Sequence, residues 1–399
     1  MEGSENVKKR KIGLVPKLIL GIILGILIGK FTPEVVVRSF VTFSGIFSAF
    51  LKFVIPFIIL GFIVAGIADL TKGAGKLLGI TTGISYASTI VAGVIAYCIA
   101  VFIFPNFITS SAIEKIGDPN AGMLEPFFSI PLSPVMDVTT AIVFAFMLGL
   151  GISKLRGSGK GEGLYNIALD FQEIIKDTLS LIIIPLLPVY IAGTFANITY
   201  SGQVFGILNI FWKVFLVVVP LQIIYICIMF IIAGSISGKN PFKMIKNQIP
   251  GYLTAIGTQS SAATIPVNVE CAEKNGVTKQ IREFVVPLCA TIHLAGSIIS
   301  LMSFSVAILM MSSMNYSLST MLPFLFILGI AMVAAPGAPG GAVMSALPFL
   351  PMIGISTESG LASLMIALYI TQDSFGTAAN VSGDNAIAVI IDKINSKIK

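Results

Sequence analysis

Long apolar segments separated by short polar connections make up most of the chain. Within the first 235 residues they predict helices at about 14–31, 42–69, 77–104, 132–153, 167–196 and 203–235. An α-helix needs about 20 residues to cross the apolar core of a bilayer, and most of these segments are at least that long. Regular alternation of apolar and polar residues, which is typical of a transmembrane β-barrel, is absent. The pattern therefore predicts an all-α integral membrane protein.

Two later apolar segments are interrupted by residues that break helices. Glycine, serine and proline interrupt the first at 257–266, and its flanks carry the basic residues that are typical of cytoplasmic connections. Glycine and proline interrupt the second at 334–342, where both flanks are predicted to be external. Two hairpins that enter the membrane from opposite faces, each followed by one long helix, indicate inverted repeats with a binding site near the midplane. They are expected at about 241–272 and 319–355.

Composition and charge add the environment and the orientation. Hydrophobic residues make up 55% of the 399 residues and charged residues 11%, which is too few charges to coat a soluble globule of this size. Lysine and arginine concentrate at both ends and in alternate connections, so both termini are expected in the cytoplasm. The short loops favour a multi-pass protein of a prokaryotic plasma membrane. The net charge of +6 follows from this topology and requires no nucleic-acid partner.

The last long apolar segment carries a polar stripe. Asp373, Thr377, Asn380 and Asp384 are spaced four, three and four residues apart, which places them on one face of a single helix. A carboxylate at the centre of a bilayer costs at least about 2.5 kcal/mol, so two on one stripe indicate ligands, ions or partners that offset this cost. The stripe therefore predicts transport of a solute.

Four motifs carry a resemblance to a known family. They are Thr258-Gln-Ser-Ser-Ala-Ala-Thr-Ile-Pro266, Pro287-Leu-Cys-Ala-Thr-Ile-His293, Ala338-Pro-Gly340 and Asp373-x-x-x-Thr377-x-x-Asn380-Val-Ser-Gly-Asp384. Together they resemble the dicarboxylate/amino acid:cation symporters, which include the glutamate transporters and the neutral amino acid exchangers. The likeness extends over essentially the whole chain, and the last motif is the most specific.

The resemblance implies a fold and a mechanism. It implies eight transmembrane helices plus two re-entrant helical hairpins, a homotrimer, and an elevator motion with the second hairpin as outer gate. A scaffold is expected from helices 1–2 at 1–76 and helices 4–5 at 131–200. Helix 3 with its external loop at 77–130 and the core at 201–399 are expected to form the mobile transport domain.

The resemblance also assigns the substrate contacts. It predicts them at Ser260, Ser261, Ser297, Ala338, Gly340, Asp373, Gly376, Thr377 and Asn380. Asp373 matches the carboxylate that pairs with the substrate amino group. Glutamate carriers place an arginine at the position of Gly376 or, alternatively, of Gln259, and neither is basic here. A buried second carboxylate would lack its bidentate partner, so a neutral amino acid is expected.

The cation sites depart further from the family pattern. The family motif Asn-Met-Asp-Gly-Thr aligns with the run 293–297, which begins with His293 and has Ala295 in place of the aspartate. A sodium site with Asn380, Asp384 and the Cys289 carbonyl is expected to persist, a second is expected from carbonyls near Ala335, and a deep site at Ser88 and Thr89 is expected to be lost. The coupling ion is therefore sodium or a proton, with no other cofactor.

His293 leaves several interpretations open. As the only histidine it is a packing residue, a proton-coupling group paired with Asp384, or a direct substrate contact. Proton coupling predicts weak sodium dependence or sodium-independent exchange. Symport of a dicarboxylate or an acidic amino acid stays an alternative. A more distant alternative is an intramembrane serine hydrolase built from Ser260 or Ser261, His293 and Asp373, although no Gly-x-Ser-x-Gly elbow is present. An anion channel is a further alternative.

Overall fold

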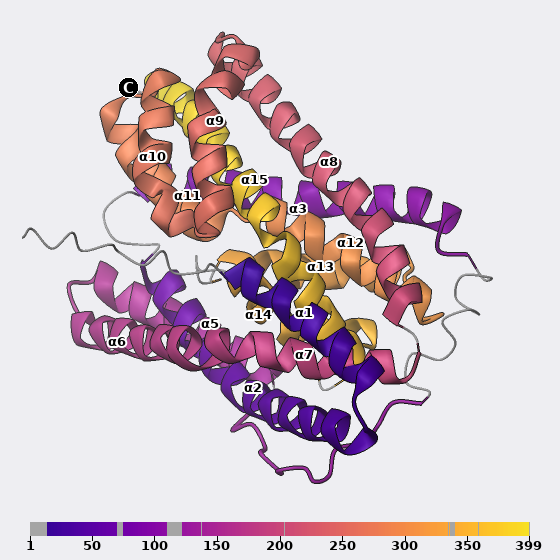
Figure 1. The fold of residues 1–399 in the computed structure, drawn as a ribbon. Helices are drawn as coiled ribbons and strands as arrows, with labels where there is room; N and C mark the ends of the chain where they lie inside the picture. The colour runs from indigo at the N-terminus through magenta and orange to yellow at the C-terminus, as the bar shows by residue number, and fades with distance from the viewer. Residues whose placement is uncertain are drawn as a thin grey trace, which may run out of the picture.

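The structure is a bundle of helices joined by short connections. The computed structural model describes residues 14–69, 75–109, 122–136, 138–202, 204–333, 335, 340–357 and 359–398. These residues form helices and irregular connections without a β-strand (Figure 1). The all-α class predicted from the sequence is confirmed.

One group of helices comes from the first half of the chain. It contains α1 (Leu14–Phe31), α2 (Glu34–Asp69), α5 (Val138–Gly157), α6 (Glu162–Thr178), the π-helical turn η2 (Leu179–Ile183) and α7 (Ile184–Tyr200). Helix α1 packs along α7, and α2 packs against α5, α6 and α7. The predicted single helix at 167–196 is instead a pair bent by 49° near the π-helical turn. Pro185 follows that turn and removes a backbone donor, which accounts for a bend there.

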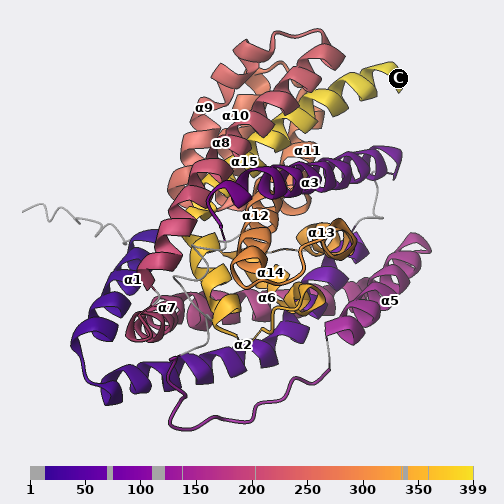
Figure 2. The ribbon, with the colours of Figure 1, turned by 90° about the vertical axis from the view of Figure 1, so that its right-hand side faces the viewer.

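A second group comes mainly from the C-terminal half. It contains α3 (Gly75–Ile103), η1 (Phe104–Asn106), α8 (Val204–Ser237), α9 (Pro241–Thr258), α10 (Ser261–Lys274), α11 (Lys279–Ile292), α12 (Ala295–Met311), α13 (Leu318–Val333), α14 (Gly341–Ala346), η3 (Leu347–Ile353) and α15 (Gly360–Ile398). Helix α15 runs through its centre and packs against α8, α9, α11 and α12. Figure 2 shows the two groups as separate layers, with α14 between α2 and the rest of the second group.

Both interrupted segments contain helix breaks. In the first, α9 packs against α10 and the chain turns at Gln259, whose φ is 53°. The Ser260 side chain accepts a hydrogen bond from the Ala263 amide, which caps α10. In the second, α13 ends at Val333 and α14 begins at Gly341, and most of the connection, including Ala338, lies outside the described residues.

A third break was not anticipated. The segment after the first hairpin, expected as one long helix, is divided into α11 and α12 by His293 and Leu294, which have extended and irregular backbone angles. The break leaves free amides at the start of α12 in the middle of the bundle. Their acceptor is a polar side chain of α15, described below.

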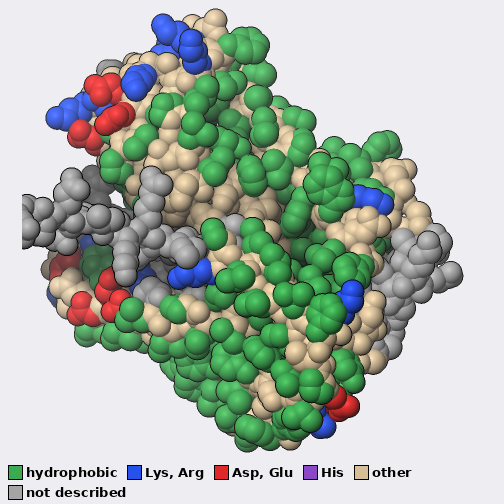
Figure 3. All heavy atoms as spheres, in the orientation of Figure 1, with side chains coloured by type: hydrophobic (Ala, Val, Ile, Leu, Met, Phe, Trp, Pro, Cys, Tyr) green, Lys and Arg blue, Asp and Glu red, His purple; other side chains and the backbone are tan. Residues whose placement is uncertain are grey.

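Length and composition support a membrane protein at a coarse level. Among the described residues four helical segments are long and apolar enough to cross a bilayer, namely Glu34–Gly61, Leu77–Asn106, Val204–Ser237 and Lys279–Met311. The bent pair Glu162–Ile183 and Pro185–Tyr200 brings the number to five. Figure 3 shows hydrophobic side chains over most of the visible surface, with charged side chains gathered toward the ends of the molecule.

The two groups meet at the beginning of α15. The Tyr190 hydroxyl of α7 is in hydrogen-bond contact with the Ser363 hydroxyl of α15. A cavity of about 570 Å³ lies beside this contact, and α2, the segment 123–134, α7 and the start of α15 line it. Ser44, Ser48 and Ser363 are among its lining residues, so the contact surface between the groups is partly polar here.

Candidate functional site

The polar stripe of α15 lies inside the bundle. Asp373, Thr377, Asn380 and Asp384 have exposed fractions of 4%, 5%, 2% and 0%. Helices α8, α9, α11 and α12 surround α15, so these side chains face other helices and not lipid. Burial of two carboxylates in an apolar bundle requires that each has polar or charged partners.

Asp373 connects α15 to the second hairpin. Its Oδ2 atom accepts a hydrogen bond of 2.7 Å from the amide of Gly340, the residue directly before α14. Gly340 has a φ of 74°, in the left-handed region that glycine adopts without strain. The predicted substrate contacts Asp373 and Gly340 are therefore next to one another, and a ligand bound to Asp373 would lie at the end of this hairpin.

Asn380 provides the acceptor for the break between α11 and α12. Its Oδ1 atom accepts hydrogen bonds from the amides of Gly296 at 2.7 Å and Ser297 at 3.2 Å. Its Nδ2 atom donates to the Ser297 hydroxyl at 2.9 Å. Because free amides and the helix dipole make the start of a helix positive, this position also suits the carboxylate of an amino acid.

His293 occupies the break itself and contacts Asp384. The His293 Nδ1 and Asp384 Oδ1 atoms are 3.0 Å apart, and both side chains are fully buried. The other ring nitrogen lies 3.0 Å from the Ser88 hydroxyl of α3, which in turn lies 2.9 Å from the hydroxyl of Tyr225 on α8. Four helical segments thus meet in one hydrogen-bonded network. Its member Tyr225 lies in an apolar segment and has no signal in the sequence that would have selected it.

The remaining predicted cation residues have individual partners. The Thr89 hydroxyl donates to the Ser85 carbonyl, and the Cys289 carbonyl accepts from the His293 amide at 2.9 Å. Ala335 is buried beyond the end of α13. The Oδ2 atom of Asp384 has no hydrogen-bond partner among the described residues. Nowhere among the residues that the structure describes do three or more His, Cys, Asp or Glu side chains form a group that could hold a metal ion.

The tip of the first hairpin also reaches α15. The Gln259 Nε2 atom donates a hydrogen bond of 2.7 Å to the Ser374 hydroxyl, directly after Asp373. Ser261 is buried, whereas Ser260 caps α10. Two broken hairpins and the break after α11 therefore converge on one stretch of α15, from Asp373 to Asp384.

Side-chain amides that had no signal in the sequence connect the first hairpin to the second half of α15. Gln248, Asn268 and Asn385 exchange hydrogen bonds of 2.6–3.3 Å. Asn275 donates to Asn385 at 3.1 Å, and Asn268 donates to the Val381 carbonyl at 2.9 Å. Such satisfied networks specify one packing arrangement, so α9 and α10 have a defined register on α15.

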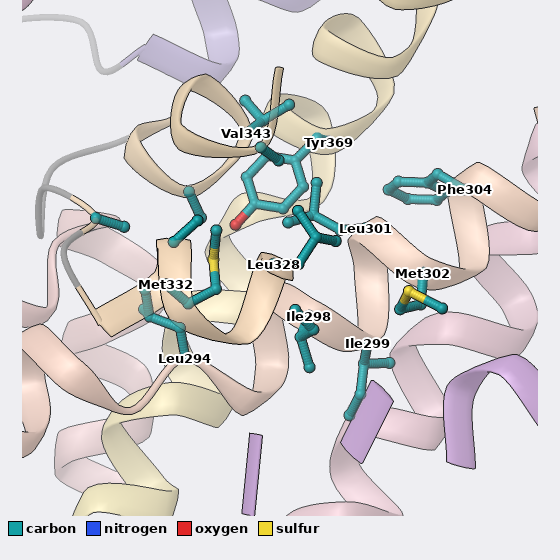
Figure 4. Packing of buried hydrophobic residues seen from close by; sticks show 14 of the residues in the cluster. Leu294, Ile298, Ile299, Leu301, Met302, Phe304, Leu328, Met332, Val343 and Tyr369 are labelled. Atoms are coloured by element: carbon teal, nitrogen blue, oxygen red, sulfur yellow. The ribbon is translucent and has the colours of Figure 1, made fainter. Parts of the chain in front are cut away.

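Apolar residues cover the other side of the stripe. Tyr369, one turn before Asp373, lies among Leu301, Leu328 and Val343 from three other helices (Figure 4). The ring is fully buried, so the site is enclosed on the side of α12, α13 and α14. Such an enclosed site suits a small ligand better than an open pore.

The geometry does not bring together the residues of the predicted serine hydrolase. The two ring nitrogens of His293 face Asp384 and Ser88, not Ser260 or Ser261. Asp373 contacts Gly340 and not the histidine. The serines at 260 and 261, His293 and Asp373 are therefore not arranged as the nucleophile, base and orienting carboxylate that acyl transfer needs.

Comparison with known proteins identifies a matching family model and relatives of this chain. The model of the Sodium:dicarboxylate symporter family matches residues 14–394. The Serine/threonine transporter SstT of Acinetobacter baumannii is 24% identical over 396 residues, which cover 96% of this chain and 97% of the relative. Excitatory amino acid transporter 3 of Oryctolagus cuniculus is 29% identical over 270 residues, which cover 66% of this chain but only 49% of the relative.

These matches support a transporter rather than an enzyme, and they cover all the helices that build the site. The resemblance found from the four motifs is confirmed. The chain belongs to the sodium:dicarboxylate symporter family.

Proposed function

We propose that this protein is a cation-coupled symporter of a small neutral amino acid. The observation that carries the proposal is the buried carboxylate of Asp373, which lies where two broken hairpins converge. The two positions at which glutamate carriers have an arginine, 376 and 259, are glycine and glutamine here. Asp373 would bind the substrate amino group, and the amides at the start of α12 beside Asn380 would lie near its carboxylate. Thr377 and Ser261 would complete the contacts to the amino acid backbone.

The absence of a basic residue at these two positions favours a neutral substrate. A glutamate or aspartate side chain buried there would leave its second carboxylate unpaired, which is costly in an enclosed site. The name of the serine/threonine transporter is consistent with a neutral substrate, whereas excitatory amino acid transporter 3 is the less complete match. Symport of an acidic amino acid is therefore the weaker alternative.

We also propose the two groups of helices as a scaffold and a moving transport domain in a homotrimer. Ser363 lies three residues after the start of α15, whereas its partner Tyr190 lies ten residues before the end of α7. The start of α15 on the proposed transport domain therefore contacts the interior of α7 on the proposed scaffold, and relative movement of the two groups would change this contact.

For coupling, the contact between His293 and Asp384 supports a specific second candidate. In this arrangement an imidazole occupies one oxygen of the carboxylate that was expected to bind sodium. If this pair takes the place of a bound sodium ion, transport would depend only weakly on sodium. It would then be driven by protons or proceed as exchange. His293→Asn, which restores the family side chain, is expected to increase the sodium dependence of uptake. Sodium dependence that is strong in the wild type and unchanged in this variant would contradict the second candidate.

Uptake by purified protein in liposomes tests the proposed substrate class. Labelled alanine, serine, threonine, aspartate and glutamate are supplied with an inward sodium gradient or an inward proton gradient. Accumulation of the neutral amino acids is expected, and accumulation restricted to the acidic ones would contradict the proposal. Gly376→Arg is expected to shift selectivity toward aspartate by about tenfold or more, because a guanidinium binds a carboxylate bidentately. Gly376→Ala provides the matched control.

A further inference from the structure

Two buried glutamines border the space beside Gly376. Gln222 on α8 and Gln372 on α15 are 1% and 3% exposed. A Cβ atom added to Gly376 would lie 3.5 Å from the Nε2 atom of each glutamine, which is an ordinary contact distance. The space that a side chain at position 376 would occupy is therefore bounded by two amide groups, three residues from the carboxylate of Asp373.

Hydrogen bonds fix how these amides are oriented. Gln222 Nε2 donates to the Gly296 carbonyl at 3.0 Å and to the Ser300 hydroxyl at 2.9 Å. Gln372 Nε2 is in hydrogen-bond contact with the same hydroxyl, which itself donates to the Gly296 carbonyl at 3.2 Å. Because a carbonyl can only accept, the nitrogen of Gln222 must face Gly296. In the arrangement in which the Ser300 hydroxyl donates to Gly296, it accepts from both glutamines.

The orientation leaves two acceptors unused. The Oε1 atoms of Gln222 and Gln372 are buried and have no hydrogen-bond partner among the described residues. Buried carbonyl oxygens are normally paired, and an unpaired one is destabilising. Two such oxygens, on the two side chains whose amide nitrogens lie 3.5 Å from the added Cβ of residue 376, call for a hydrogen-bond donor.

We propose that Gln222 and Gln372 form the subsite for the substrate side chain and accept a hydrogen bond from a hydroxyl or an amide N–H group on it. The inference rests on the proposed transport of a neutral amino acid and narrows it to side chains that carry a hydrogen-bond donor. A carboxylate would face two acceptor oxygens, and an aliphatic side chain would leave both unpaired. A site built to pair with a substrate hydroxyl discriminates strongly against the analogue that lacks it. A water molecule that bridges the two oxygens is the competing explanation.

Threonine and valine provide the decisive comparison because they have nearly the same shape and differ in one hydroxyl. The wild-type protein in liposomes is expected to take up threonine with a kcat/KM at least about tenfold higher than valine. Asparagine, compared with leucine, tests the amide donor in the same way. Equal uptake of threonine and valine, and of asparagine and leucine, would overturn the inference and favour the bridging water. Because this result still includes transport of neutral amino acids, it would leave the proposed function intact. No uptake of any neutral amino acid would reject both.

Variants test the assignment to these two residues. Gln372→Met keeps the length of the side chain and removes its amide, so the threonine preference is expected to fall about tenfold. Ser305→Ala removes a buried hydroxyl of α12 that also lacks a partner among the described residues, and the preference is expected to persist. Thermal unfolding of each purified variant checks that the variant folds. If Gln372→Met does not fold, Gln372→Leu is used in its place. A threonine preference that is unchanged in folded variants of both Gln222 and Gln372 would overturn the assignment.

Discussion

The missing side chain of Gly296 determines how closely α12 approaches α15. A Cβ atom on Gly296 would lie 2.3 Å from the carbonyl oxygen of Gly376 and 2.6 Å from the Cβ of Ala379, so no side chain fits there. The close approach brings the amides of Gly296 and Ser297 to Asn380. The break after α11 is thus useful to the site only because residue 296 lacks a side chain.

The close packing at Gly296 gives a first prediction. Gly296→Ala is expected to destabilise the protein by about 1–3 kcal/mol through overpacking, and to abolish uptake because α12 shifts away from Asn380. Gly376→Ala, whose Cβ meets only contacts of 3.5 Å and more, is expected to fold normally and serves as the control. Thermal unfolding in detergent and uptake in liposomes measure both effects. Equal unfolding temperatures for the two variants would contradict the packing described here.

Individual residues also show what the sequence can and cannot reveal. The spacing of the stripe from Asp373 to Asp384 was sufficient to place these residues together, because helical periodicity is local information. The contact of His293 with Asp384 was also anticipated, since both align with one site of the family. By contrast, Gln222, Ser300 and Tyr225 lie in apolar segments without any spacing signal, and only the packing of α8 and α12 on α15 brings them to the site.

Among the elements, α1 and α7 form the tightest pair of the first group. Gly21, Gly25 and Gly29 recur every four residues on α1 and face the backbone of α7. A Cβ on Gly25 would lie 2.5 Å from the Ala192 carbonyl oxygen. Small residues at this spacing allow two membrane helices to pack backbone to backbone, so the close pairing of α1 and α7 could have been predicted from the spacing of these glycines.

The glycine seam gives a second prediction. Gly25→Ala is expected to lower the unfolding temperature in detergent or lipid, because α1 must move off α7 by several tenths of an ångström or more. Gly83→Ala on α3 has no atom within 4 Å of its added Cβ and is expected to be neutral or slightly stabilising. An unfolding temperature that Gly25→Ala lowers no more than Gly83→Ala does would contradict the close packing of α1 on α7.

Elements that begin or end at the site were predicted less well than those that span the bundle. The helix at 14–31 agrees with α1, and the one at 77–104 agrees closely with α3. The division of 279–311 into α11 and α12 was missed because its apolar sequence is typical of one continuous helix. Its cause is tertiary: the amides released at Gly296 and Ser297 are satisfied by Asn380, more than 80 residues away.

At the scale of the whole molecule, the contact between Tyr190 and Ser363 tests relative movement of the two groups. In a protein whose native cysteines are replaced, cysteines at both positions (Y190C and S363C) are expected to be joined by a short bifunctional thiol reagent. Uptake is then expected to stop, because the link would fix one position of the transport domain, and to return when a cleavable link is reduced. Each single variant controls for loss of the native side chains. Unchanged uptake in a fully cross-linked protein would contradict an elevator motion.

The central claim is that a buried carboxylate of α15 binds the amino group of a transported neutral amino acid. Calorimetric measurement of the binding of threonine, serine and alanine to the purified protein tests this claim most directly. The wild type is expected to bind at least one of them saturably. Asp373→Asn is expected to weaken binding by about 10- to 100-fold, because a charge-assisted hydrogen bond to the ammonium group is lost. Asp392→Asn at the exposed end of α15 is expected to bind as the wild type does. Undiminished binding to a folded Asp373→Asn variant would contradict the account.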